Sequence, residues 1–517
     1  MNGANALLRT LVSGGVDTCF MNPGTSEMHF VAALDDVPEM RGVLALFEGV
    51  ATGAADGYAR MAERPAAVLL HLGPGLGNGI ANLHNARRGH TPLVNVVGDH
   101  ATYHKQYDAP LESDIDALAS NVSGWVRRSM KTAELATDAA AAIEAARRPP
   151  GQVATLILPA DVSWSEGATP VTAHTAPRRA PVSESAVAGV AAALRSGAPV
   201  AFLVGGRACR ADALALAGGI AAAHGSNLLS ETFPSRLERG AGRVAPERLA
   251  YLAEMAVAQL DGVAHLVLVD AKSPVSFFAY PDKPSDLVPD GCEVHTLATG
   301  GDDVLGALEA LASELGVART GAAVADAARP NLPDAGPLTA DALGQAIGAL
   351  LPEGAIVSDE SNTSGLFISG ATAGAPPHDW LTLTGGAIGI GLPLAAGAAV
   401  ACPDRKVLAL EADGSAMYTS QALWTMAREG LDVTVVVLSN RSYAILNMEL
   451  QRVGASAGGP RSRAMLDLHQ PDLDFVSLAQ SMGVPATRAE TAIELSEQLS
   501  RALATKGPSL VEAVITR

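Results

Sequence analysis

The sequence predicts an α/β protein built from parallel sheets, and three observations carry this prediction. Short aliphatic runs such as AAVLLHL (66–72) and QVATLILP (152–159) alternate with longer helical stretches, as in βαβ units. Hydrophobic residues reach 48% of the chain but aromatic residues only 4%, a mixture typical of parallel sheets covered by Ala-rich helices. The length of 517 residues suggests about three domains, because a single core rarely grows so large.

Two stretches without apolar periodicity divide the chain. Both contain Pro, Thr and Ala, and we interpret them as linkers. Between them lies a middle segment with its own aliphatic runs, PVAFLVGG (199–206) and HLVLVDA (265–271). The predicted division is a first domain at 1–165, a linker at 166–185, a middle α/β domain at 186–318, a second linker at 319–338 and a last domain at 339–517.

Charge and cysteine content exclude several classes of protein. The formal net charge of -18 disfavours nucleic acid and anionic membranes as partners. No apolar run reaches the ~20 residues of a membrane span, and the N-terminus lacks a secretory pattern. The four cysteines lie far apart, which argues against a cysteine zinc cluster or a disulfide framework and fits a reducing cytoplasm. We therefore expect a soluble cytoplasmic protein.

One acidic loop and one Asn follow two successive aliphatic runs in the last domain. The run KVLALEADGS (406–415) delivers Asp413, and VTVVVLSN (433–440) delivers Asn440. In an open parallel sheet, ligands collect outside such carboxyl ends, and Mg²⁺ prefers oxygen ligands together with phosphate oxygens. Gly414 would allow close approach of a phosphate, and Ser415 supplies a hydroxyl. The alternative is that Asp-Gly-Ser is an ordinary turn and helix cap.

A second acidic residue stands at a predicted strand-to-helix junction in the first domain. In ALFEGVATGAADGYAR (45–60), Glu48 ends an apolar strand and begins a helix rich in Ala and Gly. Such a tightly packed junction desolvates the carboxyl group. The alternative is a solvated helix-start residue stabilised by the helix dipole.

These two segments resemble the signatures of thiamine diphosphate (ThDP) enzymes. In that family a Glu precedes Ala-Ala-Asp-Gly-Tyr-Ala-Arg, and a second motif runs from Gly-Asp-Gly-Ser to Asn-Asn; here Ala412 and Ser439 replace two signature residues. The resemblance implies three doubly wound parallel-sheet domains, in the order pyrimidine-binding, middle and diphosphate-binding. It also implies that catalytic Glu48 hydrogen-bonds the pyrimidine ring, and that Asp413, Asn440 and the main-chain oxygen of Ser442 bind Mg²⁺.

Other segments fall where ThDP enzymes place cofactor contacts. The first is a Gly-Pro-Gly turn followed by an Asn (73–78), and the second is a polar loop (360–363). The third is a Gly-rich run with one bulky residue (385–389), and further positions lie within and just after the metal motif (413–443). Helix capping would explain the polar loop equally well. The residues implied to bind the cofactor, besides Glu48, are Asn78, Asn362, Thr363, Gly386, Ile388, Gly414, Ser415, Tyr418 and Tyr443.

The predicted substrate side resembles benzoylformate decarboxylase. NPGTSE (22–27) and LLHLGPG (69–75) place Thr25 and His71 at positions that are catalytic in that enzyme, and a His can move protons near neutral pH. However, Ala279 stands near the position of a second catalytic His. The implied substrate pocket contains Leu111, Leu446 and Glu449.

Acetolactate synthase large subunits are also similar over all three domains. The middle segment lacks a recognisable flavin pattern, so we do not expect FAD. We expect a ThDP- and Mg²⁺-dependent enzyme that decarboxylates a small 2-oxo acid and passes the enamine to a proton or to a second carbonyl. By the same resemblance it is a homodimer at minimum and a homotetramer in full. Two alternatives remain: a 2-hydroxyacyl or 2-hydroxyketone lyase that releases no CO2, and a non-catalytic ThDP-binding regulatory protein.

Overall fold

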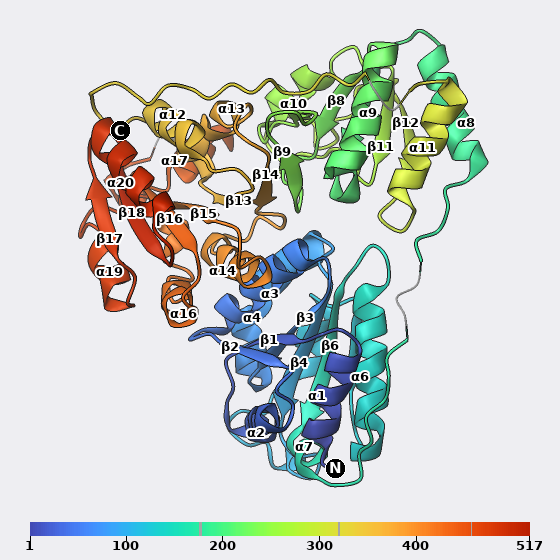
Figure 1. The fold of residues 1–517 in the computed structure, drawn as a ribbon, viewed down its shortest axis with the longest axis vertical. Coiled ribbons are helices and arrows are strands. Elements are labelled where there is room, and N and C mark those ends of the chain that lie inside the picture. Colours follow the sequence, from blue (N-terminus) through green and yellow to red (C-terminus); the bar gives the residue numbers. More distant parts are fainter. Residues whose placement is uncertain (175–177, 319–320, 456–457, 517) are drawn as a thin grey trace.

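Three parallel sheets form the framework of the protein in a computed structural model that describes residues 1–174, 178–318, 321–455 and 458–516. Figure 1 shows three bodies: the first at the bottom, the middle one at the upper right and the last at the upper left. The predicted α/β fold with parallel sheets is confirmed. Parts of both predicted linkers, 175–177 and 319–320, lie outside the described residues, as does the last residue, 517.

The first sheet has six parallel strands with helices on both faces. Apolar side chains of successive strand residues alternate between two cores, one beneath α3 and α4 and the other beneath α1 and α6. The strand order is β2 (Arg41–Leu44), β1 (Thr18–Met21), β3 (Ala66–Leu70), β4 (Leu93–Asp99), β6 (Val153–Pro159) and β5 (Trp125–Arg128). The helices are α1 (Gly3–Ser13), η1 (Thr25–Glu27), α2 (Met28–Asp36), α3 (Glu48–Ala62), α4 (Leu72–Arg88), η2 (Lys105–Tyr107), α5 (Ile115–Ser120), α6 (Thr132–Arg147) and α7 (Ala160–Trp164).

The middle sheet has five parallel strands and its own pair of cores. Its order is β10 (Glu247–Arg248), β8 (Asn227–Ser230), β7 (Val200–Val204), β11 (His265–Val269) and β12 (Glu293–Ala298). The helices are α8 (Glu184–Arg195), η3 (Gly206–Cys209), α9 (Ala211–His224), α10 (Ala253–Leu260) and α11 (Val304–Leu315). β12 therefore forms one edge of this sheet.

The last sheet has seven strands, and one of them comes from the middle segment. β9 (Leu237–Arg239) pairs antiparallel with β14, at the edge of a sheet that is otherwise parallel. The order is β17 (Ala486–Ala489), β18 (Ser509–Val514), β16 (Val433–Ser439), β15 (Val407–Ala412), β13 (Ile356–Glu360), β14 (His378–Thr382) and β9. The helices are α12 (Ala340–Leu350), η4 (Asn362–Gly365), α13 (Ile368–Ala371), α14 (Gly391–Ala401), α15 (Asp413–Ala416), α16 (Ala422–Glu429), α17 (Ala444–Arg452), α18 (Pro460–Ala464), α19 (Phe475–Ser481) and α20 (Ala492–Ala504).

Helices α3 and α14 join the first domain to the last. Both are buried almost throughout, and their side chains belong to one continuous core. A Cβ at Gly57 would lie 2.0 Å from the Leu394 carbonyl oxygen, and a Cβ at Gly397 would lie 1.8 Å from the Ala54 carbonyl oxygen. Only glycine permits such close approach of two backbones, so these two positions fix how the first and last domains sit together.

Arg60 lies at the point where all three domains meet. Its guanidinium forms a bidentate pair with Asp56, at 2.7 and 2.6 Å, and both side chains are buried. It also donates to the carbonyl oxygens of Thr382 (2.8 Å) and Ser235 (3.1 Å). These acceptors belong to the last domain and to the middle segment, so one side chain links the three parts. Among the described residues, no helix is both long and apolar enough to cross a membrane.

Candidate cofactor and active site

Glu48 begins α3 and is almost fully buried, with 7% of its surface exposed. Its carboxylate accepts a hydrogen bond from the Asn78 side chain at 3.0 Å, and a Cβ at Gly75 would lie 3.0 Å from its other oxygen. α4, which carries both residues, therefore packs directly against this carboxylate. Asn78 itself is exposed on the single chain. The first domain thus presents a desolvated acid beside an open polar surface.

His71 and Glu27 form a second pair in the first domain. Nδ1 of His71, at the carboxyl end of β3, lies 2.7 Å from Oε2 of the buried Glu27. The same oxygen accepts the N–H of Gly24 at 2.8 Å, which holds the turn that precedes η1. Burial raises the pKa of Glu27, while the neighbouring His71 opposes that rise. Thr25 begins η1 and is exposed beside this pair.

Asp413 and Asn440 lie at the carboxyl ends of β15 and β16, which are adjacent and parallel. Asp413 is 2% exposed and accepts the main-chain N–H groups of Arg441 (2.6 Å) and Gly414 (2.8 Å). Burial raises the pKa of this carboxyl group, and these N–H donors partly offset the rise. The side-chain oxygen of Asn440 accepts the N–H of Ser442 at 2.8 Å. The three predicted metal ligands therefore lie together in the two loops that follow β15 and β16.

The polar loop and the helix start lie beside this loop pair. Asn362 donates to the Ser415 hydroxyl at 3.1 Å, and Asn440 donates to the Ser364 hydroxyl at 2.8 Å. Asn362 and the next residue, Thr363, are exposed. Ser364 was not predicted, because a lone Ser in a capping loop carries no distinctive spacing.

Two tyrosines flank the same start of α15. A Cβ at Gly414 would lie 2.5 Å from the Tyr443 ring, so the ring covers that glycine. Burial, and then the neighbouring Tyr418 and Asp413, raise the pKa of Tyr443. Tyr418 is 52% exposed. The predicted cofactor residues of the last domain therefore surround one patch that opens to solvent in the single chain.

The Gly-rich loop 385–389 is held by residues that the sequence analysis missed. Asn85 of α4 donates to the Ala387 carbonyl at 2.8 Å, and Asn82 donates to the Gly389 carbonyl at 3.3 Å. Gly386 has a φ of +76° and is exposed, and a Cβ there would meet no atom within 4 Å. Ile388 packs against the shared core from this loop. In the sequence, Asn82 and Asn85 are two polar residues of a predicted helix, and nothing near them indicates that they bind a loop about 300 residues later.

A buried pair of acids lies behind this loop. Burial raises the pKa of Glu360 to about 7, and the N–H groups that it accepts from Gly389 (2.7 Å) and Gly391 (2.6 Å) partly offset that rise. Burial raises the pKa of Glu411 far above its ordinary value, and the adjacent Glu360 raises it further. Glu411 therefore favours its protonated form, beside the Glu360 side chain that fixes the loop. Glu411 was not predicted, because an acid inside an apolar strand carries no pattern that indicates a function.

The predicted substrate residues do not meet within one chain. Leu111 of the first domain is 40% exposed, and Leu446 of α17 is 45% exposed. Glu449, one turn further along α17, lies 3.7 Å from Arg452 of the same helix, and its carboxylate also faces Tyr280 of the middle segment. Burial and the adjacent Glu449 raise the pKa of Tyr280 to about 12.

Comparison with known proteins identifies the family. Residues 1–120 match the N-terminal TPP-binding domain of thiamine pyrophosphate enzymes, and residues 367–513 match the C-terminal TPP-binding domain. A protein named as an acetolactate synthase large subunit (IlvX) of Mycobacterium tuberculosis is 62% identical over 516 residues, which cover 100% of this chain and 99% of that protein. The chain belongs to the thiamine pyrophosphate enzymes.

Other relatives of this thiamine pyrophosphate (ThDP) enzyme are named as decarboxylases. Benzoylformate decarboxylase of Pseudomonas aeruginosa is 31% identical, with 96% of each chain covered. The structure of a ThDP-dependent 4-hydroxybenzoylformate decarboxylase of Rhodococcus jostii superposes with a TM-score of 0.88 at 25% identity, covering 100% of this chain and 99% of that chain.

The residues present fit ThDP and its metal. A carboxylate and a carboxamide oxygen at adjacent strand ends match the hard oxygen ligands that Mg²⁺ prefers. The open space over Gly386 leaves room for close approach of a ligand to the backbone. In the first domain, Glu48 presents a buried carboxylate that can form a hydrogen bond with a ring nitrogen of the cofactor. The donor chemistry of both halves is therefore suitable.

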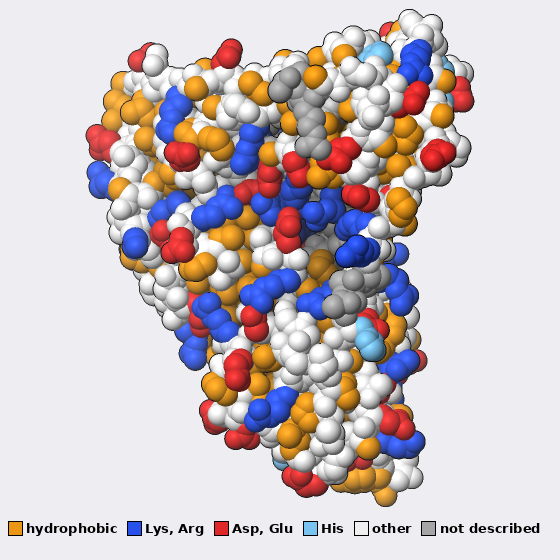
Figure 2. All heavy atoms as spheres, turned by 45° about the vertical axis from the view of Figure 1, so that its right-hand side comes forward, with side chains coloured by type: hydrophobic (Ala, Val, Ile, Leu, Met, Phe, Trp, Pro, Cys, Tyr) orange, Lys and Arg blue, Asp and Glu red, His pale blue; other side chains and the backbone are white. Residues whose placement is uncertain are grey.

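A separate cavity of about 880 Å³ lies between the first domain and the middle segment. Figure 2 shows basic side chains gathered across this waist of the molecule. Three acids, Glu63, Glu231 and Asp270, also line the cavity, and burial together with repulsion from Asp270 raises the pKa of Glu231 to about 7. The basic residues that line the cavity are Arg60, Arg64, Arg88, His90, Arg147, Arg179, Arg207, Arg210 and Lys272.

Proposed function

We propose that this protein is a Mg²⁺-dependent ThDP enzyme that decarboxylates a 2-oxo acid and delivers the remaining acyl fragment to a proton or to a second carbonyl. The observation that carries the proposal is the presence of two half-sites with complementary chemistry on one chain. One presents the buried Glu48 with the His71–Glu27 pair, and the other presents Asp413 and Asn440 at adjacent strand ends. Relatives named as an acetolactate synthase large subunit and as benzoylformate decarboxylase support this class of reaction.

Each half-site has a distinct task in this proposal. ThDP, when bound, would supply a nucleophilic carbon and an electron sink for the loss of CO2 from a 2-oxo acid. Asp413, Asn440 and the Ser442 carbonyl would hold Mg²⁺ at the diphosphate, while Glu48 would hydrogen-bond the pyrimidine ring. His71, oriented by Glu27, would move a proton at the substrate, with Thr25 beside it. The diphosphate and ring contacts would come from the exposed patch around Asn362, Thr363, Gly386, Ile388, Gly414, Ser415, Tyr418 and Tyr443, and from Asn78.

We further propose that two chains build each site, in a homodimer or a homotetramer that acts in the cytoplasm. Large apolar side chains around the half-site of the last domain are exposed on the single chain, among them Leu446 (45%), Phe367 (48%) and Leu366 (75%). Apolar surface of this kind around a half-site favours burial against a partner. Leu111 from one chain would then meet Leu446 and Glu449 from the other to form the substrate pocket.

A complementation experiment tests the shared site. Glu48→Gln and Asp413→Ala each disable one half-site, so each variant alone should be inactive. If the halves come from different chains, a mixed dimer contains one site with both defects and one intact site. Equal mixing should then restore roughly a quarter of wild-type activity. Mixed oligomers without activity would contradict the shared site, while active single variants would contradict the proposed function.

Product analysis distinguishes the proposed reaction from its alternatives. Pyruvate, benzoylformate and glyoxylate should be tried as substrates, with CO2, aldehyde and acyloin followed together. Release of CO2 supports decarboxylation, and acyloin formation supports transfer to a second carbonyl. Cleavage of a 2-hydroxyketone or 2-hydroxyacyl thioester without CO2 would indicate a lyase. Failure of bound ThDP to exchange its C2 proton would indicate a non-catalytic binding protein.

A further inference from the structure

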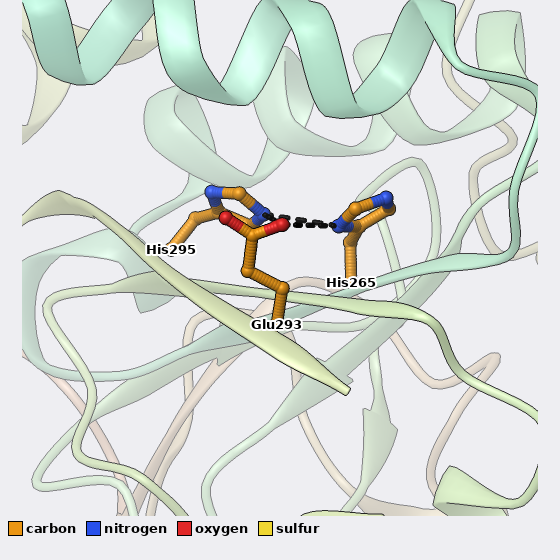
Figure 3. A group of neighbouring side chains, drawn as sticks. All are labelled: His265, Glu293 and His295. Atoms are coloured by element: carbon orange, nitrogen blue, oxygen red, sulfur yellow. Dashed lines mark hydrogen bonds and ion pairs between the residues drawn. The ribbon is translucent and has the colours of Figure 1, made fainter. Parts of the chain in front are cut away.

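Three potential metal ligands meet on the middle domain, on the face of the sheet that α8 and α11 cover. His265 begins β11, and Glu293 and His295 lie on the adjacent strand β12. His265 pairs in register with Glu293, and His295 follows two residues later, so all three side chains project from the same face of the sheet. Figure 3 shows the two imidazoles and the carboxylate turned toward one another.

The ligand atoms of this cluster lie close together. Nδ1 of His265 is 3.1 Å from Nε2 of His295. The Glu293 carboxylate oxygen is 3.6 Å from the first nitrogen and 3.8 Å from the second. The imidazoles are mostly buried, with 18% and 16% of their side chains exposed, whereas Glu293 is 68% exposed. The cluster therefore has a mostly buried pair of imidazoles and one exposed carboxylate beside them.

These separations agree with the geometry of a tetrahedral zinc ion. Zn–N and Zn–O bonds of about 2.0–2.1 Å at a tetrahedral angle place neighbouring ligand atoms about 3.3 Å apart. The observed separations of 3.1, 3.6 and 3.8 Å bracket that value, so shifts of a few tenths of an ångström would complete the site. We propose that His265, Glu293 and His295 form a zinc site with water as the fourth ligand.

The position of the cluster indicates a structural role for the zinc ion. Parallel strands β11 and β12 carry the cluster at their amino ends, whereas the cavity of about 880 Å³ lies at the carboxyl ends, around Asp270 and Thr299. β12 is the edge strand of the sheet. Zinc would cross-link this edge strand to its neighbour, and a ligand that binds only the folded state raises its stability. The cluster belongs to the middle domain, whereas the proposed ThDP residues belong to the first and last domains, so the zinc site is separate from the ThDP chemistry.

A neutral pair of imidazoles is the competing explanation for the same geometry. One ring N–H could donate to the other ring at 3.1 Å, with Glu293 as a loose neighbour and no ion involved. The two explanations differ in what zinc does to the protein. A zinc site binds the metal in equal ratio to the chain and stabilises the fold, whereas a hydrogen-bonded pair does neither.

Zinc binding to the ThDP- and Mg²⁺-loaded protein tests the proposal, because Mg²⁺ then occupies the proposed site at Asp413. Dialysis against limiting Zn²⁺, followed by elemental analysis, should find about one zinc per chain. His265→Gln, His295→Gln and Glu293→Gln should each weaken binding at least tenfold. Co²⁺ in place of zinc should give the visible absorption of a tetrahedral complex, which should be lost in both His variants.

His174→Gln provides the matched control, because His174 is 86% exposed and lies outside the cluster. It should keep both the zinc and the thermal stabilisation that zinc confers. Glu293→Gln guards against misfolding, since this exposed side chain can change without disturbing the core. Equal zinc contents in wild type and all three cluster variants, or the lack of any zinc-dependent rise in Tm, would overturn the proposal.

Discussion

Nδ1 of His71 lies 2.7 Å from Oε2 of Glu27, and the same oxygen accepts the N–H of Gly24 at 2.8 Å. One buried carboxylate therefore fixes both the imidazole and the turn that leads to Thr25. A carboxylate in this position holds the ring in one orientation. The pair is the part of the half-site that can move a proton.

Replacing Glu27 by Gln should slow turnover without loss of cofactor. The amide keeps the size of the side chain but carries no charge. Its NH2 group would also face the N–H of Gly24, so two hydrogen-bond donors would meet where one donor and one acceptor meet now. We expect kcat to fall about 100-fold, with an unchanged Kd for ThDP, measured by steady-state kinetics and calorimetry. Glu39→Gln, on an exposed residue, is the control. A normal kcat would show that His71 does not depend on this carboxylate.

Glu48→Gln should abolish turnover while ThDP still binds. The amide can keep its contact with Asn78, but it cannot favour the reactive form of the pyrimidine ring as a carboxylate does. Proton exchange at C2 of bound ThDP, followed by NMR, should become slow in this variant. Rapid exchange together with near-normal turnover would remove Glu48 from the proposed catalytic role.

Asp413→Ala should weaken Mg²⁺-dependent ThDP binding by about 100-fold or more. The change removes a buried oxygen ligand at the end of β15, and Asn440 with the Ser442 carbonyl offers too few ligand oxygens. Titration calorimetry at fixed Mg²⁺ measures the effect. Asp404→Ala, at an exposed position before the same strand, should bind like the wild type. Equal affinities for all three proteins would place the metal elsewhere.

How far the site follows from sequence depends on how local each contact is. Asp413 and Asn440 could be predicted because the carboxyl ends of successive parallel strands share one edge of a sheet. Glu48 could be predicted because an acid at a strand-to-helix junction is a local pattern. Asn85 could not, since the loop that it holds lies far away in the chain, and Glu411 could not, since an acid inside an apolar strand carries no local pattern. Glu449 faces the middle segment in the single chain, and its predicted place in the substrate pocket stays a prediction.

The overall fold was predictable for a related reason, with one exception. Alternating aliphatic runs and Ala-rich helices indicate parallel sheets whatever the order of the strands. β9 has only three residues, and its partner strand β14 lies about 140 residues later. A strand so short carries no periodicity by which to assign it to a sheet.

Asp56→Ala should destabilise the fold strongly. The substitution leaves the buried guanidinium of Arg60 without its carboxylate and removes the acceptor of the Thr91 hydroxyl. We expect a loss of about 3–5 kcal/mol in the free energy of unfolding, measured from urea denaturation curves. Asp35→Ala, on an exposed position of α2, should stay within about 0.5 kcal/mol of the wild type. Similar curves for both variants would contradict the role of this pair.

Glu231 should make stability fall as pH rises from about 4.5 to about 7. Burial, and then repulsion from Asp270, raise its pKa from 4.5 to about 7 in the folded protein. In this window the unfolded chain has already lost the proton that the folded chain retains, so ionisation favours unfolding. The loss stays under about 3 kcal/mol, because the side chain is partly exposed. Glu231→Gln should flatten this part of the pH profile of Tm, and an unchanged slope would contradict the assignment.

β9 makes the middle segment a structural part of its neighbour. Without it, β14 would present a row of free main-chain donors and acceptors, a surface on which strands of other molecules can add. An excised last domain should therefore be prone to aggregate, whatever the quality of its own core. Exchange of the middle segment between relatives would succeed only if the incoming piece carried a matching edge strand, which restricts how such enzymes can diversify by recombination.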